Sequence, residues 1–266
     1  TAARTIRIRN VHITSDTDTN EFGVYIQQAN KTVYIEECWI QGGDFSIAII
    51  EDIDVFMFHN HVEVNARPLS GGAAIFTNDA DAVIRMHGDT VDGVIYRNAG
   101  VITYKNNSGQ YEVWQGAYDS VAATTIHNGM SIQDAITAAA AETPAPGTAI
   151  QVPGPIVYGY ITYTVLIHPG LYDESVALAH YVNLKGVGPP GSVVVHQRNA
   201  TVVGIDGNYT TEVQNITFRL TADDGGLDRI FWDRGNDATI KLRDIVFEAA
   251  VSGGSIINSY VTEWCN

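Results

Sequence analysis

Short stretches in which apolar and polar residues alternate recur along the chain, and each is interrupted by one polar residue near its middle. Residues 6–13 read Ile-Arg-Ile-Arg-Asn-Val-His-Ile, and residues 33–40, 211–218 and 240–247 follow the same order, with Thr once in place of the first apolar residue. The first two stretches are 27 residues apart and the last two 29. Alternation with a period of two predicts short strands that each bury one face.

A second series of short apolar stretches lies between these. It comprises residues 24–26, 47–49, 74–76, 203–205, 230–232 and 255–257. Strands that recur about every 25 residues without intervening helices are typical of a solenoid, in which each coil buries its apolar face only by stacking on its neighbours. The sequence therefore predicts an all-β fold, a right-handed parallel β-helix. A jelly roll or β-sandwich is the rival fold, and it would show hairpin turns between the strands.

The polar residue inside each repeat is expected to form a turn. Stacked coils would place Asn10, Asn215 and Asp244 at equivalent positions of this turn. Cys38 falls at an apolar position of the repeat, aligned with Val11, so we expect it to be a small buried residue.

One helix is predicted, over residues 131–141. Ser131 and Asp134 form an S-x-x-D capping box, and Ile132, Ala135, Ile136 and Ala139 share one face. The segment Thr-Pro-Ala-Pro-Gly at 143–147 should end this helix.

The segment around this helix resembles a known family. The order Ser-Ile-Gln-Asp-Ala-Ile at 131–136, Val-Leu-Ile-His-Pro-Gly-Leu-Tyr-Asp-Glu at 165–174 and Val-Asn-Leu-Lys-Gly-Val-Gly at 182–188 is similar to the N-terminal part of pectinesterases, within the pectin-lyase-like superfamily. The resemblance covers about residues 126–197. It implies that a helix caps the start of a β-helix in the middle of the chain.

Two regions follow from this resemblance. Residues 1–115 are expected to be β-helix coils without an N-terminal cap, and residues 116–266 a helix-capped start followed by further coils. Either the chain holds the tail of one β-helix and the head of another, or its end continues into the start of another copy. Because an uncapped coil is an exposed sheet edge, we expect a homo-oligomer or polymer formed by end-to-end stacking. The chain opens at Thr1, so we expect a processed form or a piece of a longer protein.

Composition and net charge restrict the classes of molecule that this chain could bind. A formal net charge of −15 disfavours nucleic acids and anionic membrane surfaces as partners. No apolar run is long enough to predict membrane insertion. With two cysteines, a disulfide framework and a cysteine-based zinc site are excluded.

Five N-x-S/T sequons favour an extracellular, cell-surface or virion-surface protein, although β-helix turns are themselves rich in Asn and Thr. The sequons lie at Asn30, Asn106, Asn199, Asn208 and Asn215.

Few residues are candidates for a catalytic or metal-binding role. No catalytic residue is predicted, because the nucleophile and other signatures of pectinesterases are missing; only Leu-Asp-Arg-Ile-Phe at 227–231 echoes one of them. Asp16, Asp18 and Asn20 have the spacing of half a calcium loop, so calcium is the one cofactor considered, against a plain polar turn. His59 and His61 are expected on one strand face, as a metal-chelating pair or as two surface residues.

These observations favour a non-enzymatic structural or adhesive protein over an enzyme. The expected role is a filament, sheath, virion fibre or surface adhesin that assembles end to end and could bind a polysaccharide. The aromatic residues that could stack on sugar rings are the thirteen Tyr and the four Trp, namely Trp39, Trp114, Trp232 and Trp264, although packing in the core or at coil turns explains most of them equally well. The alternative is a carbohydrate-active enzyme, a pectinesterase-like esterase or a polysaccharide lyase. A lyase would use Asp223, Asp224, Asp228 and Asp233 with Arg229 or Arg234, but solvated acidic turn residues explain this segment better.

Overall fold

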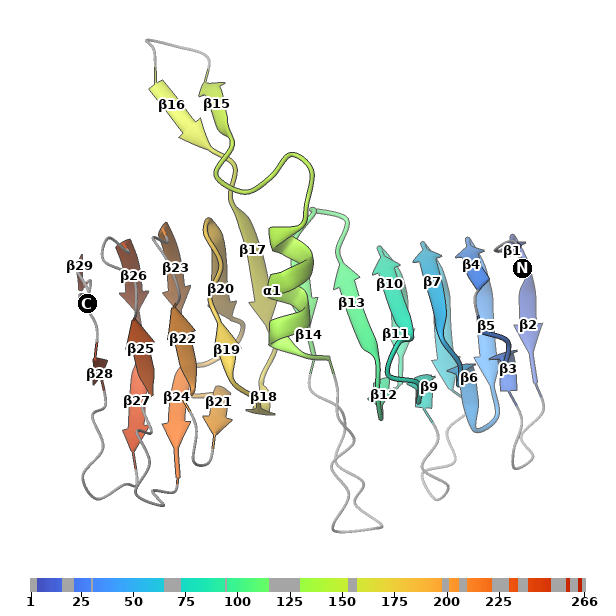
Figure 1. Cartoon of the computed structure of the whole chain (residues 1–266). Helices are drawn as coiled ribbons and strands as arrows, with labels where there is room; N and C mark the ends of the chain where they lie inside the picture. The colour runs from blue at the N-terminus through green and yellow to red at the C-terminus, as the bar shows by residue number, and fades with distance from the viewer. Residues whose placement is uncertain are drawn as a thin grey trace. The chain divides into compact units, whose positions relative to one another are not determined.

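The computed structural model divides into two compact units, each a parallel β-helix (Figure 1). Unit 1 comprises residues 1–109 and 115–130, and unit 2 comprises residues 110–114 and 131–266. The structure describes residues 4–15, 22–29, 31–64, 73–93, 95–114, 130–152, 157–197, 201–205, 210–221, 230–233, 239–249, 257–258 and 263–264.

Unit 1 is built from three parallel sheets that the chain visits in turn. The first sheet contains β1 (Arg4–Arg9), β4 (Lys31–Glu36), β7 (Ile53–Phe58), β10 (Val83–His87) and β13 (Val101–Lys105). The second contains β2 (His12–Thr14), β5 (Trp39–Gly42), β8 (His61–Val64) and β11 (Thr90–Asp92). The third contains β3 (Phe22–Ile26), β6 (Phe45–Ile49), β9 (Ala73–Thr77) and β12 (Ile95–Arg97).

Unit 2 repeats this three-sheet plan. Its first sheet contains β14 (Tyr111–Val113), β17 (Tyr163–Ile167), β20 (Val182–Gly186), β23 (Thr210–Gln214), β26 (Thr239–Arg243) and β29 (Glu263–Trp264). The second contains β18 (Gly170–Asp173), β21 (Val193–Gln197), β24 (Thr217–Leu220) and β27 (Val246–Ala249). The third contains β19 (Val176–Ala177), β22 (Val203–Ile205), β25 (Phe231–Asp233) and β28 (Ile257–Asn258).

The predicted fold class and the predicted repeat register are both confirmed. Ile6 pairs with Val33, and Thr211 pairs with Ile240, which are the offsets of 27 and 29 residues seen in the sequence. The inward-facing side chains of successive coils stack into a continuous apolar core. In unit 1 one such row holds Val33, Val55, Ile84 and Ile102, all buried.

The apolar stretches of the second series pair without offset in the first two coils, where Val24 pairs with Ile47, and with an offset of one residue in later coils. Ile47 pairs with Ile75 rather than with Ala74, and Val203 pairs with Phe231 rather than with Ile230. Ala73 and Ala74 are both fully buried, so this strand does not alternate strictly between buried and exposed residues. Without strict alternation the phase could not be read from the pattern.

The polar turn residues adopt the left-handed conformation. Asn10, Glu37 and His59 in unit 1, and Asn215 and Asp244 in unit 2, have φ between 53° and 55°. Their backbone N–H groups continue the parallel ladder, as Glu37 N does when it donates to Phe58 O at 2.9 Å. Asn and Asp tolerate this conformation better than most residues, which explains the polar residue at this position of the repeat. Cys38, directly after the turn, is buried as predicted.

The helix α1 (Ile132–Ala140) lies in unit 2 and contacts β14, β17, β19 and β20. Ser131 is its N-cap and accepts a hydrogen bond from Asp134 N at 3.2 Å. The predicted apolar face is confirmed, since all four of its residues are buried.

Strand β14 pairs with β17 and lies in unit 2, and the predicted first region extended to residue 115. An antiparallel hairpin, β15 (Ala149–Val152) and β16 (Val157–Tyr160), separates α1 from β17 and was not predicted. The sequence between the two strands contains Pro-Gly-Pro at 153–155, a combination typical of connections between strands.

Candidate functional site

The first coil of unit 1 has an open apolar side. Strand β1 is hydrogen-bonded to β4 and has no second strand partner among the described residues. Ile6 points inward at the same register position as Val33, yet it is 41% exposed whereas Val33 is 1% exposed. Val11 is likewise exposed, while Cys38, its equivalent in the next coil, is buried. The first coil therefore exposes side chains whose equivalents in the next coil belong to the core.

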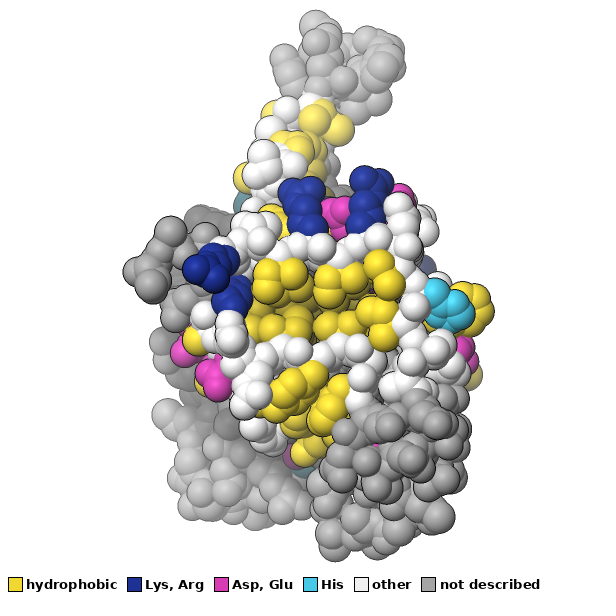
Figure 2. Space-filling view, turned by 90° about the vertical axis from the view of Figure 1, so that its right-hand side faces the viewer, with side chains coloured by type: hydrophobic (Ala, Val, Ile, Leu, Met, Phe, Trp, Pro, Cys, Tyr) yellow, Lys and Arg dark blue, Asp and Glu magenta, His cyan; other side chains and the backbone are white. Residues whose placement is uncertain are grey.

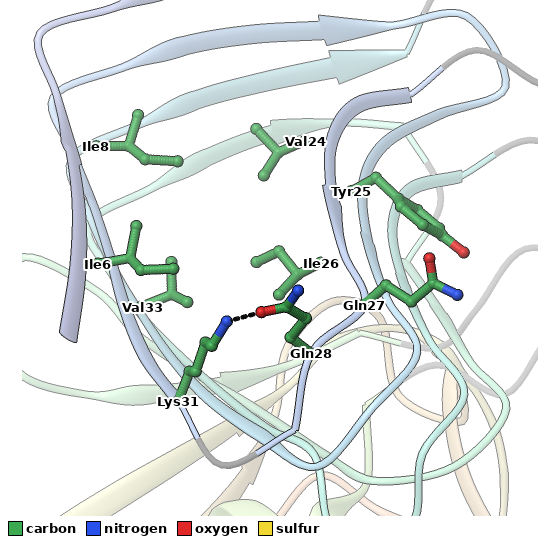
Figure 3. A pocket seen from close by; sticks show the side chains of 9 residues that line it. All are labelled: Ile6, Ile8, Val24, Tyr25, Ile26, Gln27, Gln28, Lys31 and Val33. Atoms are coloured by element: carbon green, nitrogen blue, oxygen red, sulfur yellow. Dashed lines mark hydrogen bonds between the residues drawn. The ribbon is translucent and has the colours of Figure 1, made fainter. Parts of the chain in front are cut away.

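These side chains line a pocket of about 350 Å³ between β1, β3 and β4. Figure 3 shows Ile6, Ile8 and Val33 facing Val24 and Ile26 across it. At one edge, Lys31 donates a hydrogen bond to Gln28. The pocket is thus apolar at its centre and polar at its margin.

The same arrangement is visible from outside. Figure 2 looks onto this end and shows apolar side chains gathered at the centre of the face, with charged side chains of both signs at its rim. Strand β1 contributes three arginines within six residues, Arg4, Arg7 and Arg9. We call this apolar surface with its charged rim the open end.

A second surface lies on the outer side of the second sheet of unit 1. The buried residues Ile40 and Val62 alternate there with two outward rows. One row holds His12, Trp39, His61 and Thr90, and the other holds Thr14, Gln41, Glu63 and Asp92. We call these two rows together the ring face.

Trp39 is the centre of the ring face. It is 47% exposed and lies between His12, with ring centroids 5.2 Å apart, and His61, at 4.8 Å. Trp39 Nε1 donates to Glu63 Oε1 at 3.2 Å, and His61 Nε2 is 3.1 Å from Glu63 Oε2. The hydrogen bonds from His61 and then Trp39 lower the pKa of Glu63, so this carboxylate is ionised at neutral pH.

His59 and His61 do not share a strand face, which corrects the sequence interpretation. His59 occupies the left-handed turn, and its ring lies 5.8 Å from that of His87, while His61 begins β8 and faces Trp39. A residue with positive φ at the start of this segment breaks the period-two alternation on which the prediction relied. Within the described ranges no group of three or more His, Cys, Asp or Glu side chains could hold a metal ion.

A hydrogen-bonded relay crosses three consecutive coils of unit 2. His196 Nδ1 lies 2.6 Å from Asp173 Oδ1, and His196 Nε2 lies 2.6 Å from Thr221 Oγ1. His196 is 8% exposed, whereas the Asp173 carboxylate is mostly in solvent and Thr221 is half-buried. If Nδ1 donates to Asp173, Nε2 is free to accept the Thr221 hydroxyl proton, which is the order of groups that activates a hydroxyl nucleophile.

Two residues of the Gly-Leu-Tyr-Asp-Glu segment at 170–174, Tyr172 and Glu174, make structural contacts. Glu174 Oε1 accepts from Ile132 N at 2.8 Å, and Glu174 Oε2 accepts from Ser131 Oγ at 2.7 Å and Gln133 N at 3.2 Å. The Tyr172 hydroxyl donates to backbone carbonyls, including that of His168 at 2.8 Å. A carboxylate at a helix N-terminus satisfies free N–H groups and complements the helix dipole.

A buried acid lies inside unit 1 and was missed from the sequence. Asp89 is 5% exposed and occupies the position after the turn that Cys38 and Asn60 hold in preceding coils. Its Oδ1 accepts from Asn60 N and Nδ2, at 2.8 and 2.7 Å, and its Oδ2 accepts from His87 N at 2.8 Å. Burial raises the pKa of Asp89 to about 6 in spite of these bonds.

The remaining predicted sites are distributed as follows. The calcium candidates Asp16, Asp18 and Asn20 lie outside the described residues, as do the sequon residues Asn30, Asn199 and Asn208. Asn106 lies in a turn and its Oδ1 accepts from Ser108 N at 2.9 Å. The acidic and basic side chains between 223 and 234 are likewise not described.

Asn215 is the sequon residue with the clearest structural role. Its Nδ2 donates to Gly186 O at 3.1 Å and Gly188 O at 3.0 Å. A glycan would be attached at this nitrogen, so the geometry favours a turn residue over a glycan acceptor.

Among the described residues no helix is long and apolar enough to cross a membrane. Comparison of the chain with protein-family models, with curated proteins and with solved structures finds no match.

Proposed function

We propose that this chain is a non-enzymatic structural or adhesive β-helix that assembles end to end into a fibre or sheath at an extracellular, cell or virion surface. The observation that carries the proposal is the open end. Exposed apolar side chains next to a strand with a free hydrogen-bonding edge favour addition of another strand.

In this proposal a second copy of this chain covers the open end. Charge supports this choice, because β1 carries three arginines, of which Arg9 is paired with Glu36 and Glu37, while the chain as a whole has a net charge of −15. A basic edge on an acidic protein attracts another acidic copy. Ion pairs already link neighbouring coils within each unit. Arg85 lies 2.8 Å from Asp54 in unit 1, and Arg219 lies 2.6 Å from Glu248 in unit 2. A head-to-tail contact of this kind does not close on itself, so it builds an open filament.

The likeness to pectinesterases is, in our proposal, one of fold and not of activity. The conspicuous shared segment ends in Glu174, and that carboxylate binds the N-terminus of α1. A contact that stabilises a helix cap serves the architecture, and a fold by itself does not assign an activity.

Substitution of one open-end residue tests the proposal. Ile6→Lys places a charge at the centre of the apolar face, where burial against a partner would leave it unpaired and costly. Leu171→Lys is the matched control, because Leu171 on β18 has the same 41% exposure as Ile6. Sedimentation velocity over a hundredfold range of concentration should show growing assemblies for the unmodified chain and for Leu171→Lys, and a monomer for Ile6→Lys.

Two results would contradict the proposal. The unmodified chain could remain a monomer at the highest concentration, which would mean that something other than a second copy covers the open end. Alternatively, Ile6→Lys could assemble as readily as the control, which would place the contact elsewhere.

A second candidate function is ester hydrolysis, and the Asp173–His196–Thr221 relay is the observation that favours it. Thr221 Oγ1 would attack the ester carbonyl while its proton passes to His196 Nε2; the alcohol would leave with that proton, and water would then release the acid from Thr221. This chemistry differs from the carboxylate chemistry implied by the pectinesterase likeness.

Two substitutions of Thr221 test this second function with a p-nitrophenyl acetate assay. Thr221→Val keeps the shape and His196, and it should lower the rate at least a hundredfold, whereas Thr221→Ser should retain the rate because it keeps the hydroxyl. An unchanged rate in Thr221→Val, or no release of p-nitrophenol above background in the unmodified chain, would rule out a nucleophilic Thr221.

A further inference from the structure

The ring face has the geometry of a binding surface for an extended ligand. Its aromatic rings occupy one register position of β2, β5 and β8, so they are repeated at the spacing of the coils, about 4.8 Å. Its polar side chains lie two residues further along the same strands and therefore on the same outer side. A ligand that follows the stacking direction would meet rings along one edge and hydrogen-bonding groups along the other.

The central ring is held in place before any ligand binds. Glu63 accepts hydrogen bonds from Trp39 at 3.2 Å and from His61 at 3.1 Å, so the indole has little freedom left to lose. Binding to a preorganised side chain costs less conformational entropy than binding to a mobile one. Trp39 as a residue remains 47% exposed, so part of its surface can contact a ligand.

The polar row defines the hydrogen-bonding and charge preferences of the ligand. Thr14 offers a hydroxyl, Gln41 an amide, and Glu63 and Asp92 carboxylates. These groups suit a ligand rich in hydroxyls. Two carboxylates on a chain of net charge −15 oppose an anionic ligand through like-charge repulsion.

We infer that the ring face binds a linear, uncharged polysaccharide laid along the stacking direction of the coils. One sugar ring stacks on Trp39, and neighbouring hydroxyl groups donate to Glu63 and bond with Gln41. The inference rests on the adhesive role proposed above and names its ligand class. The charge of the polar row disfavours polyuronates and other acidic glycans.

Affinity electrophoresis and calorimetry of the full chain test the inference, with soluble xylan, mixed-linkage glucan and galactomannan as neutral probes and polygalacturonate as the acidic probe. At least one neutral probe should bind, and polygalacturonate should not. Trp39→Ala should weaken the neutral binding at least tenfold, because stacking area is lost. Tyr160→Ala is the control, since Tyr160 on β16 is a comparably exposed aromatic residue at 52% and lies outside the ring face.

The inference fails if no neutral probe binds, if polygalacturonate binds more tightly than the neutral probes, or if Trp39→Ala binds as well as the control. Ile6→Lys separates this result from the assembly proposal. Per chain, its affinity for the neutral probe should equal that of the unmodified protein even where it no longer assembles. Loss of binding in Ile6→Lys would contradict a site that one chain completes.

Discussion

Glu174→Ala should destabilise unit 2 by about 3 kcal/mol, because hydrogen bonds to a charged acceptor contribute about 1.5–3 kcal/mol and truncation leaves several donors without a partner. Three donors are affected, namely Ser131 Oγ and the backbone N–H groups of Ile132 and Gln133. These groups lie at the N-terminus of α1, where a negative charge also interacts favourably with the helix dipole. Urea denaturation followed by circular dichroism would measure the loss.

Two further variants make this result specific. Glu174→Gln keeps one acceptor oxygen but turns an amide toward N–H donors, so its stability should lie between those of the unmodified chain and Glu174→Ala. Thr137→Ala alters the exposed side of the same helix and should change stability by less than about 0.5 kcal/mol. An equal stability of Glu174→Ala and Thr137→Ala would show that the carboxylate does not support the helix.

The second large expected effect is that Asp89 makes the stability of the fold depend on pH. Its pKa is about 6 in the folded chain, against 3.8 for an unperturbed aspartate, so the folded state binds the proton more tightly than the unfolded state does. The contribution of Asp89 to the free energy of unfolding is therefore largest well below pH 4. This contribution decreases as the pH rises through 6, and the total loss is about 3 kcal/mol. This direction is opposite to that of an acid held in a surface ion pair.

Asp89→Asn isolates this contribution from the titration of other groups. The difference in unfolding free energy between the unmodified chain and Asp89→Asn should decrease by about 2 kcal/mol between pH 4 and pH 7. Asp92→Asn, on the exposed side of β11, matches the change in net charge without altering a buried site. A pH-independent difference for Asp89→Asn would mean that the folded protein does not bury an acid there.

The features that could be predicted from the sequence are those that repeat. The alternation in residues 6–13 and 33–40 revealed the strand register because both coils place the same positions inward. The helix was predictable because Ile132 and Ala139 belong to one apolar stripe with a capping residue before it. Both patterns are local, and the physics that produces them acts within a few residues.

The candidate sites were harder to predict because they depend on which residues neighbouring coils bring together. Asp173, His196 and Thr221 are separated by 23 and 25 residues, whereas the pairs used to define the repeat are separated by 27 and 29. Coil length varies, so the contact between these side chains is not visible in the spacing. Asp89 was missed because it is a polar residue at an apolar position of the repeat, and its partner Asn60 lies in another coil.

The ring face was only partly anticipated. Trp39 was considered as a residue that could stack on a sugar, but its neighbours were not identified. Glu63 lies 24 residues from Trp39 in the chain, and only the parallel register of β5 and β8 places them together. The left-handed turn at His59 also places His59 and His61 on different faces, although their spacing in the sequence predicted one face.

Electron microscopy of the concentrated protein tests the proposed stacking of coils between chains most directly. We expect rods one β-helix wide, with a layer line at about 4.8 Å along the rod axis from strands that run across it, and none in Ile6→Lys. Single compact particles at every concentration, or rods whose strands run along the axis, would contradict the account.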